Sequence, residues 1–255
     1  MTAKRYQYLA VMAALVVVAN MQLVLGATTD DVDAARRILE KADQIRFPNE
    51  GFEVEVRINT ATTGQSAEVR KYLILSKGNA NTLVMITEPA SERGQIMLMK
   101  DRDLWIYLPS VSQPVRLSLG QRLTGQVANG DLARANFSGD YTPKILREDV
   151  INGETYHVLE LTAVDRTVTY SKVLYWVKQS SFWPHRAEFY SLSNRLLKIA
   201  RYENFQTQVG AMRPTRLVME DALRKGEESV LEYSSMKLRD LPDKIFTKDQ
   251  LNRLQ

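Results

Sequence analysis

No cysteine occurs among the 255 residues, and histidine occurs only twice, at His157 and His185. The absence of cysteine excludes disulfides, iron–sulfur clusters, thiolate zinc sites and cysteine nucleophiles. It also excludes a lipid anchor attached through cysteine at a cleavage point. The folded chain must therefore be stabilised by burial of a hydrophobic core alone.

Patterns typical of catalysis are also scarce. Both histidines lie in strand-like segments, where a lone histidine is more often structural than catalytic. The G-x-S-x-G nucleophile motif is missing, and "GQRLTGQ" at 120–126 has glutamine where a phosphate-binding loop needs lysine. Carboxylates show no clustering that favours a metal. We therefore predict that the protein is not an enzyme and has no catalytic residue, no cofactor and no metal site.

Charge and hydrophobic content narrow the class of protein further. The chain has 34 basic and 30 acidic residues, a formal net charge of +4, with no concentrated basic stripe. Nucleic-acid binding requires such a stripe, so we predict no nucleic-acid partner. A hydrophobic content of 44% is too low for an integral membrane protein and too high for a disordered chain. One substantial core is expected.

The first 27 residues have the pattern of a secretory signal peptide. Lys4 and Arg5 precede a long apolar stretch that ends at the small residues Gly26 and Ala27. The alternative is an uncleaved membrane anchor, although Asn20 and Gln22 interrupt the apolar stretch. We predict a signal peptide over 1–27, a single domain over 28–255, and a location in a bacterial periplasm.

Hydrophobic periodicity predicts one helix followed by a long run of strands. The segment "TDDVDAARRILEKADQIRF" has apolar residues at helical spacing, with Thr29 or Asp30 as the N-cap. From Gly51 the period changes to two, and turn signals separate the strands. The expected strands are 52–59, 67–76, 81–88, 95–100, 103–109, 144–150, 155–164, 170–178, 185–191, 195–206, 213–221 and 228–238. A short helix starting near Thr247 is expected at the C-terminus. These elements predict a mainly β (α+β) domain with roughly eleven or twelve antiparallel strands.

The segment 117–143 interrupts this run of strands. It is rich in glycine and asparagine and only weakly periodic, although "NGDLARANF" predicts a short helix capped by Asn129 or Asp131. A long irregular excursion within a compact domain is usually functional. We expect a lid or a binding loop here.

Several strands are apolar on both faces, "IMLM" and "LWIYLP" within 94–111 above all. One helix and a short terminal helix are too little to cover both faces of so many strands, which favours a cavity. An ordinary sandwich core is the alternative. Strand parity selects as cavity-lining residues Met85, Met97, Met99, Trp105, Tyr107, Trp176 and Phe189. We expect Arg102 and Arg116 at the rim, facing an anionic head group.

The segments "DRDLWIYLPSVSQPVRLS", "RLTGQVANGDLARANFSGDYTPKIL", "YSKVLYWV", "FWPHRAEFYS" and "DKIFTKDQL" resemble the LolA-like outer-membrane lipoprotein-sorting proteins. This resemblance implies a strongly curved half-barrel sheet wrapped around one N-terminal helix and short lid helices, with a hydrophobic cavity for acyl chains. It also implies an inner-membrane exporter of the RND or ABC type and an outer-membrane acceptor as partners. Many members have "GSDF" after the W-x-Y-L-P strand, whereas this chain has "NGDLARANFSGDY".

Three functional hypotheses follow. The leading one is a periplasmic carrier that binds acyl chains of a lipoprotein or lipid and moves them towards the outer membrane. The second is a periplasmic lipid-sensing module that regulates a partner without transport. The third is an enzyme acting on envelope lipids, which would need His157 or His185 beside a carboxylate in the cavity.

Overall fold

The structure is a computed structural model that describes residues 29–64, 66–78, 80–111, 113–134 and 136–251. The predicted signal peptide therefore lies outside the described residues. Within those five ranges, no helix is both long enough and apolar enough to span a membrane.

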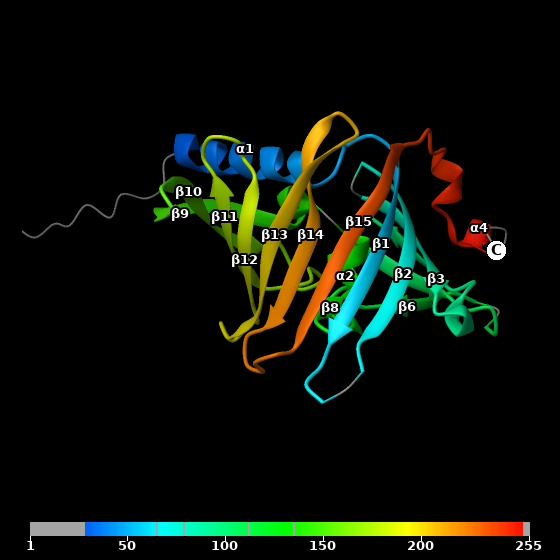
Figure 1. The fold of residues 1–255 in the computed structure, drawn as a ribbon. Helices are drawn as coiled ribbons and strands as arrows, with labels where there is room; N and C mark the ends of the chain where they lie inside the picture. The colour runs from blue at the N-terminus through cyan, green and yellow to red at the C-terminus, as the bar shows by residue number, and fades with distance from the viewer. Residues whose placement is uncertain (1–28, 65, 79, 112, 135, 252–255) are drawn as a thin grey trace, which may run out of the picture.

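The chain begins with the predicted helix, α1, over Thr29–Arg46. Acidic residues occupy its first turn and Arg46 its last, which is the charge order that the helix dipole favours. Ala35, Leu39 and Ala42 share one face at helical spacing and are completely buried. This face packs on the concave side of the sheet, mainly against β9 and β14 (Figure 1).

Thirteen strands form one antiparallel sheet in the order β6-β5-β4-β3-β2-β1-β15-β14-β13-β12-β11-β10-β9. Its strands are β1 (Phe52–Ala61), β2 (Glu68–Lys77), β3 (Asn81–Glu88), β4 (Ile96–Lys100), β5 (Asp103–Tyr107), β6 (Val115–Leu117), β9 (Tyr141–Ile151), β10 (Glu154–Ala163), β11 (Lys172–Lys178), β12 (Pro184–Tyr190), β13 (Leu196–Gln208), β14 (Ala211–Asp221) and β15 (Glu228–Leu238). A separate hairpin pairs β7 (Arg122–Thr124) with β8 (Val127–Ala128). The short helices are η1 (Ala90–Glu92), α2 (Asn129–Ala133), α3 (Phe137–Asp140), η2 (Asp243–Ile245) and α4 (Lys248–Leu251).

The predicted fold class is confirmed. Each of the twelve strands expected from the sequence is present, and β6, β7 and β8 are additional. The terminal strands β6 and β9 do not pair with each other, so the sheet is an open half-barrel (Figure 1). The helix predicted at "NGDLARANF" is present as α2 over Asn129–Ala133, and α3 begins only at the last residue of that segment, Phe137. Asn129 and Asp131 both lie inside α2, and Ala128 is the N-cap.

Bulges help to bend this sheet. The register shifts within the pairs β1–β15, β2–β3, β9–β10, β11–β12 and β12–β13. An extra residue on one strand kinks it and increases the local twist, so repeated bulges curve a wide sheet. The concave side that results contains the main hydrophobic core.

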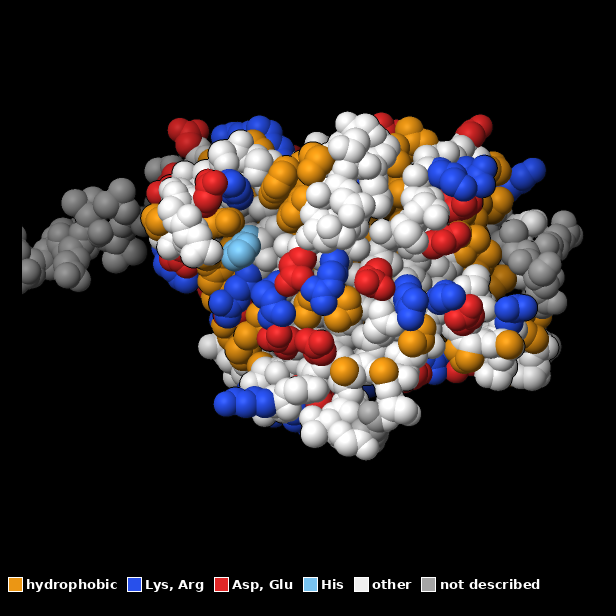
Figure 2. Space-filling view, viewed as in Figure 1, with side chains coloured by type: hydrophobic (Ala, Val, Ile, Leu, Met, Phe, Trp, Pro, Cys, Tyr) orange, Lys and Arg blue, Asp and Glu red, His pale blue; other side chains and the backbone are white. Residues whose placement is uncertain are grey.

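The convex side of β12 to β15 faces solvent. Figure 2 shows acidic and basic side chains alternating in a band across this face. The band includes the ion pairs of Arg201 with Glu220 and of Arg216 with Glu203. Like the alternation in "FEVEVRIN", this pattern is typical of a strand with one buried and one solvated face.

The convex side of β3 to β5 is covered by the C-terminal segment. Leu83, Ile96 and Leu98 form a second hydrophobic cluster with Phe246 and Leu251, which belong to the segment around η2 and α4. Phe246 is 1% exposed, and burying such a side chain contributes about 1.5–3 kcal/mol. More protein therefore covers the second apolar face of β4 and β5.

Candidate ligand-binding site

The segment 118–134, which we call the plug, enters the concave side of the sheet. It contains the β7–β8 hairpin and α2. Leu119, Val127, Leu132 and Ala133 of the plug are buried in the main core with α1 and the inner face of the sheet. The sequence predicted a lid or binding loop here, and the segment fills the interior rather than only covering it.

Two glycines let the plug approach its neighbours closely. A Cβ atom on Gly125, whose φ is +49°, would lie 2.3 Å from Ser229 Oγ and 2.5 Å from the Thr60 side chain. A Cβ atom on Gly130 in α2 would lie 2.0 Å from Thr169 Oγ1. A larger residue at either position would displace the plug.

The carboxylate of Asp131 is the centre of the polar contacts that hold α2. Its oxygens accept hydrogen bonds from the Tyr170 hydroxyl at 2.7 and 2.8 Å, and one accepts from the backbone N–H of Ala128 at 2.8 Å. Lys198 Nζ lies 3.3 Å from Asp131 Oδ2 and also donates to the Gln126 carbonyl. Burial, together with the nearby Asp131 charge, raises the pKa of Tyr170 well above its ordinary value. Tyr170 therefore stays a hydrogen-bond donor at neutral pH.

A second set of polar contacts holds the C-terminal end of the plug at Arg134. Arg134 forms two hydrogen bonds to the carboxylate of Asp140, one of them 2.6 Å from Nη2 to Oδ1, and a third to the Asp101 carbonyl. Arg102 donates to the same carboxylate at 3.2 Å and forms an ion pair with Asp165. Asp140 thus connects the plug and α3 to the β4–β5 turn.

Two small voids lie between described residues inside the half-barrel. One void of about 30 Å³ lies between Arg46, Phe137, Phe189 and Tyr202, and another of about 20 Å³ lies beside Leu132. Pockets that hold small molecules measure about 300–1,000 Å³. The two voids found between described residues inside the half-barrel are thus far smaller than the vacant hollow expected from the sequence, because the plug occupies that space.

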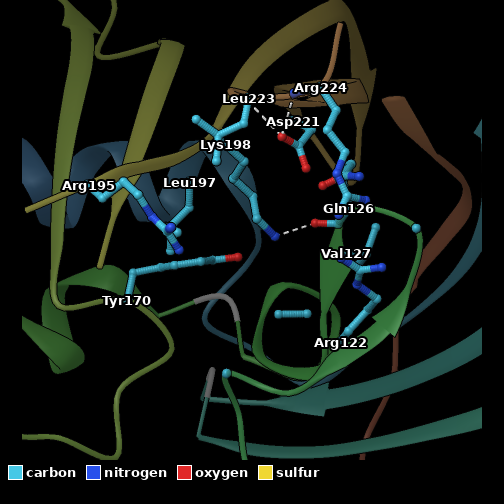
Figure 3. Close-up of a pocket in the computed structure, with 13 residues that line it drawn as sticks. Arg122, Gln126, Val127, Tyr170, Arg195, Leu197, Lys198, Asp221, Leu223 and Arg224 are labelled. Carbon is cyan, nitrogen blue, oxygen red and sulfur yellow. Dashed lines mark hydrogen bonds between the residues drawn. The ribbon is translucent and has the colours of Figure 1, made fainter. Parts of the chain in front are cut away.

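Two larger hollows open at the surface. One of about 280 Å³ lies where the plug meets the ends of β13 and β14, and Figure 3 shows Arg122 and Arg195 on opposite sides of it with Lys198 between them. The other, of about 380 Å³, lies on the convex side next to the exposed residues Glu55 and Arg57.

The structure places the seven residues predicted to line a cavity on two different faces. Met97, Met99 and Phe189 lie in the concave core, and Phe189 borders the 30 Å³ void. The other four lie on the convex side, which corrects the predicted face: Met85, Trp105, Tyr107 and Trp176. Parity could not assign the face, because these strands are apolar on both sides.

The contacts of the four show what they do instead. Met85, Trp105 and Tyr107 pack in the cluster covered by the C-terminal segment, where the ammonium of Lys248 lies 4.0 Å from the centre of the Trp105 ring. The Trp176 indole N–H donates to Asp149 at 2.8 Å. Ligand binding by Met97, Met99 and Phe189 stays a prediction.

The two arginines expected at a rim are both paired. Arg102 contacts Asp140 and Asp165, and Arg116 contacts Asp103. Neither lines one of the cavities described above. Contact of either arginine with a head group stays a prediction.

Sequence reasoning missed Asp131, Tyr170 and Lys198, although one signal was present. Lys198 has the same strand parity as Ala200 and Tyr202, which face the core. A lysine at a core position needs a buried anionic or polar partner. The position of that partner was not readable from the sequence, because Asp131 lies 67 residues away in an irregular segment.

The two histidines have different neighbours. The His185 ring is tilted against Tyr156 with 4.8 Å between ring centres, and burial lowers the pKa of His185. His157 Nδ1 lies 3.8 Å from a carboxylate oxygen of Glu148 and 3.3 Å from the Gln179 amide. Among the described residues, no group of three or more histidine, aspartate or glutamate side chains could hold a metal ion.

A LolA superfamily protein from Nitrosomonas europaea is 67% identical to this chain, with a TM-score of 0.82 over 84% of this chain and 98% of that protein. The chain belongs to the LolA superfamily. A family model described only as an uncharacterized protein also matches residues 78–253. No curated protein matches the sequence.

Two more distant solved structures share the fold. A DUF1329 family protein from Desulfovibrio piger is 23% identical, with a TM-score of 0.74 over 88% of this chain and all of that protein. A putative outer membrane lipoprotein-sorting protein domain from Vibrio parahaemolyticus is 20% identical, with a TM-score of 0.73 over 87% of this chain and all of that domain. At these identities the likeness concerns the half-barrel architecture alone.

Proposed function

We propose that this LolA superfamily protein is a periplasmic carrier for the acyl chains of a lipoprotein or lipid. Membership of a superfamily with a carrier-type fold supports this role, as does the name of the lipoprotein-sorting domain with the same architecture. The observation that carries the proposal is the plug, an irregular segment with apolar side chains inside a curved sheet and polar groups at its margin.

The plug supplies a mechanism for loading. Each methylene that an acyl chain buries contributes about 0.8 kcal/mol, so a long chain can offset the loss of the plug's own apolar contacts. Leu132 and Val127 leave apolar surface behind when the plug withdraws, and acyl chains take their place. Release is the reverse process: the plug returns to the concave face of the sheet and displaces the acyl chains, because both bind the same apolar surface.

The proposal includes delivery between two membranes. A chain that leaves the inner membrane needs a donor that presents it, for which we propose an exporter of the RND or ABC type, and an acceptor at the outer membrane. The carrier needs no catalytic group for this exchange, and we propose no enzymatic role for it.

The experiment is extraction followed by transfer. Protein purified from the periplasm is extracted with organic solvent and its lipid identified by mass spectrometry. Lipid-free protein is then mixed with donor vesicles that contain a fluorescent acyl lipid and with unlabelled acceptor vesicles. The proposal predicts bound lipid and transfer at a rate proportional to protein concentration. Bound lipid that never transfers would favour a sensor, chemically altered lipid would favour an enzyme, and no lipid binding would refute all three.

A further inference from the structure

The 280 Å³ surface cavity beside the plug differs from the interior in charge. Four basic residues line it, Arg122, Arg195, Lys198 and Arg224, and one acidic residue, Asp221. The Asp221 carboxylate already accepts hydrogen bonds from the backbone N–H groups of residues 223 and 224, at 2.8 and 3.0 Å. The cavity therefore has an excess of positive charge.

Two of these cations have no carboxylate partner. Lys198 pairs with Asp131 and Arg224 with Glu227, whereas Arg122 and Arg195 form no ion pair with any residue that the structure describes. Both arginines are exposed and lie on opposite sides of the cavity (Figure 3). Guanidinium groups bind carboxylates and phosphates through two parallel hydrogen bonds, so the chemistry of both arginines suits an oxyanion.

The cavity also has an apolar side. Leu197 and the Tyr170 ring line it, and the Leu223 side chain beside them is 66% exposed. A free oxyanion gains nothing from these side chains. A molecule with an anionic head group and a hydrocarbon tail gains from both sides of the cavity.

The position of the cavity connects it to the interior. Tyr170 lines both this cavity and the 30 Å³ void, and its hydroxyl binds Asp131. Lys198 contacts Asp131 from the cavity side at 3.3 Å. An anion in the cavity would compete with Asp131 for Lys198 and so weaken the contact that holds α2.

We propose that the cavity formed by Arg122, Arg195 and Lys198 binds the anionic head group of an amphiphile whose tail enters beneath the plug. This inference rests on the proposed carrier function and adds to it the charge class of the cargo. The head group docks first, competes for Lys198, and so favours withdrawal of the plug when an apolar tail is present to replace it.

The test measures which lipid the protein takes from one mixed membrane. Lipid-free protein is incubated with vesicles of equimolar phosphatidylglycerol and phosphatidylcholine with identical acyl chains, and the bound lipids are quantified by mass spectrometry. The wild-type protein should prefer phosphatidylglycerol. The double variant Arg122→Gln/Arg195→Gln should lower the ratio of bound phosphatidylglycerol to phosphatidylcholine roughly tenfold, the size expected from two partly exposed ion pairs. The matched control Arg37→Gln/Lys237→Gln removes the same charge from exposed positions elsewhere and should leave the ratio unchanged.

Salt supplies a second readout without substitutions. The wild-type preference should decrease as ionic strength rises from 0.1 to 1 M, because the Debye length shortens from about 10 to about 3 Å. Equal uptake of both lipids by the wild type, or a ratio that the double variant leaves unchanged, would overturn the head-group site while the carrier function stands. Uptake of neither lipid would refute the carrier function itself. Binding of sodium phosphate is measured by calorimetry. Phosphate that binds as tightly as the lipid would show that the cavity is a site for a free oxyanion, and the proposal of an amphiphile would be wrong.

Discussion

Helix α1 and the plug both lie against the concave face of the sheet, but different contacts hold them there. The inward face of α1 contributes Ala35, Leu39 and Ala42, which are completely buried. The plug buries Leu119, Val127, Leu132 and Ala133 in the same core, and it is held in addition by the hydrogen bonds and ion pairs of Asp131 and Arg134. An apolar side chain that leaves the core gains no compensating interaction with water. A polar group that leaves its partner forms hydrogen bonds with water instead.

This difference predicts separate roles for α1 and the plug on the concave side of the sheet. The net contribution of a typical hydrogen bond is about 0.5–1.5 kcal/mol, so the polar contacts of the plug can be exchanged at moderate cost. We therefore expect α1, a regular helix of 18 residues, to stay in the core, and the irregular plug to be the segment that moves.

The largest expected effect is on α1. Leu39→Ala removes a completely buried side chain and should lower the free energy of unfolding by about 2–5 kcal/mol. Urea unfolding followed by circular dichroism measures it. Glu40→Ala, at the neighbouring exposed position, is the control and should change the value by less than about 0.5 kcal/mol. A loss for Leu39→Ala no larger than that of the control would show that α1 is not a permanent part of the core.

A smaller and more local effect is expected at the plug. Lys198→Met removes the cation beside Asp131 and leaves an unbranched side chain that is one atom shorter. Opening of residues 118–134 should become easier by about 1–3 kcal/mol, because the Asp131 carboxylate loses a buried partner. Hydrogen exchange measures this opening as faster exchange in α2, with the β10 and β11 amides unchanged.

The control for that variant is Lys237→Met, at an exposed position of β15. Its exchange pattern should match that of the wild type. If Lys198→Met lost protection equally in the plug and throughout the sheet, the prediction would be wrong. Such a result would show that the plug opens only when the whole domain unfolds.

The smallest expected effect lies outside both segments, at His185. Burial lowers the pKa of His185 below its ordinary value, so the unfolded chain binds the proton more readily than the folded one. Stability is therefore greatest above the ordinary pKa of about 6.5 and falls as the pH decreases towards the folded value. His185→Gln should reduce this loss between pH 7 and 5, measured by thermal unfolding. Hydrogen exchange that becomes faster only in the plug as the pH falls from 7 to 5, and that stays slow in His185→Gln, would contradict this prediction. It would show that protonation of His185 acts on the plug.

The sequence predicted α1 and twelve strands because their periodicity follows directly from burial of one face. It missed β6, β7 and β8, which have two or three residues and no apolar period of their own. The β7–β8 hairpin depends instead on contacts across the fold, such as the close approach of Gly125 to Ser229. No local pattern encodes a contact between segments 104 residues apart.

The site was less predictable than the fold. Alternation assigns a face only where one side of a strand is polar, and "IMLMK" in β4 is apolar on both sides. The packing of the C-terminal segment on the convex side could not be predicted either. A short segment such as 243–251 has no sequence pattern that indicates which strands it will contact. The irregular composition of 117–143 did predict a functional loop, although not that it fills the interior.

A reversible lock on the plug tests the central claim most directly. The double variant Gly130→Cys/Thr169→Cys introduces the chain's first two cysteines where a Cβ on residue 130 would lie 3.1 Å from Thr169 Cβ. A disulfide spans about 3.5–4.5 Å between Cβ atoms, so a shift of a few tenths of an ångström permits it. We predict that the oxidised protein neither binds nor transfers acyl lipid between vesicles, and that dithiothreitol restores both, with oxidised Thr169→Cys alone as the control. Transfer by the locked protein at the rate of its reduced form would contradict the account, because the cargo would then bind without movement of the plug.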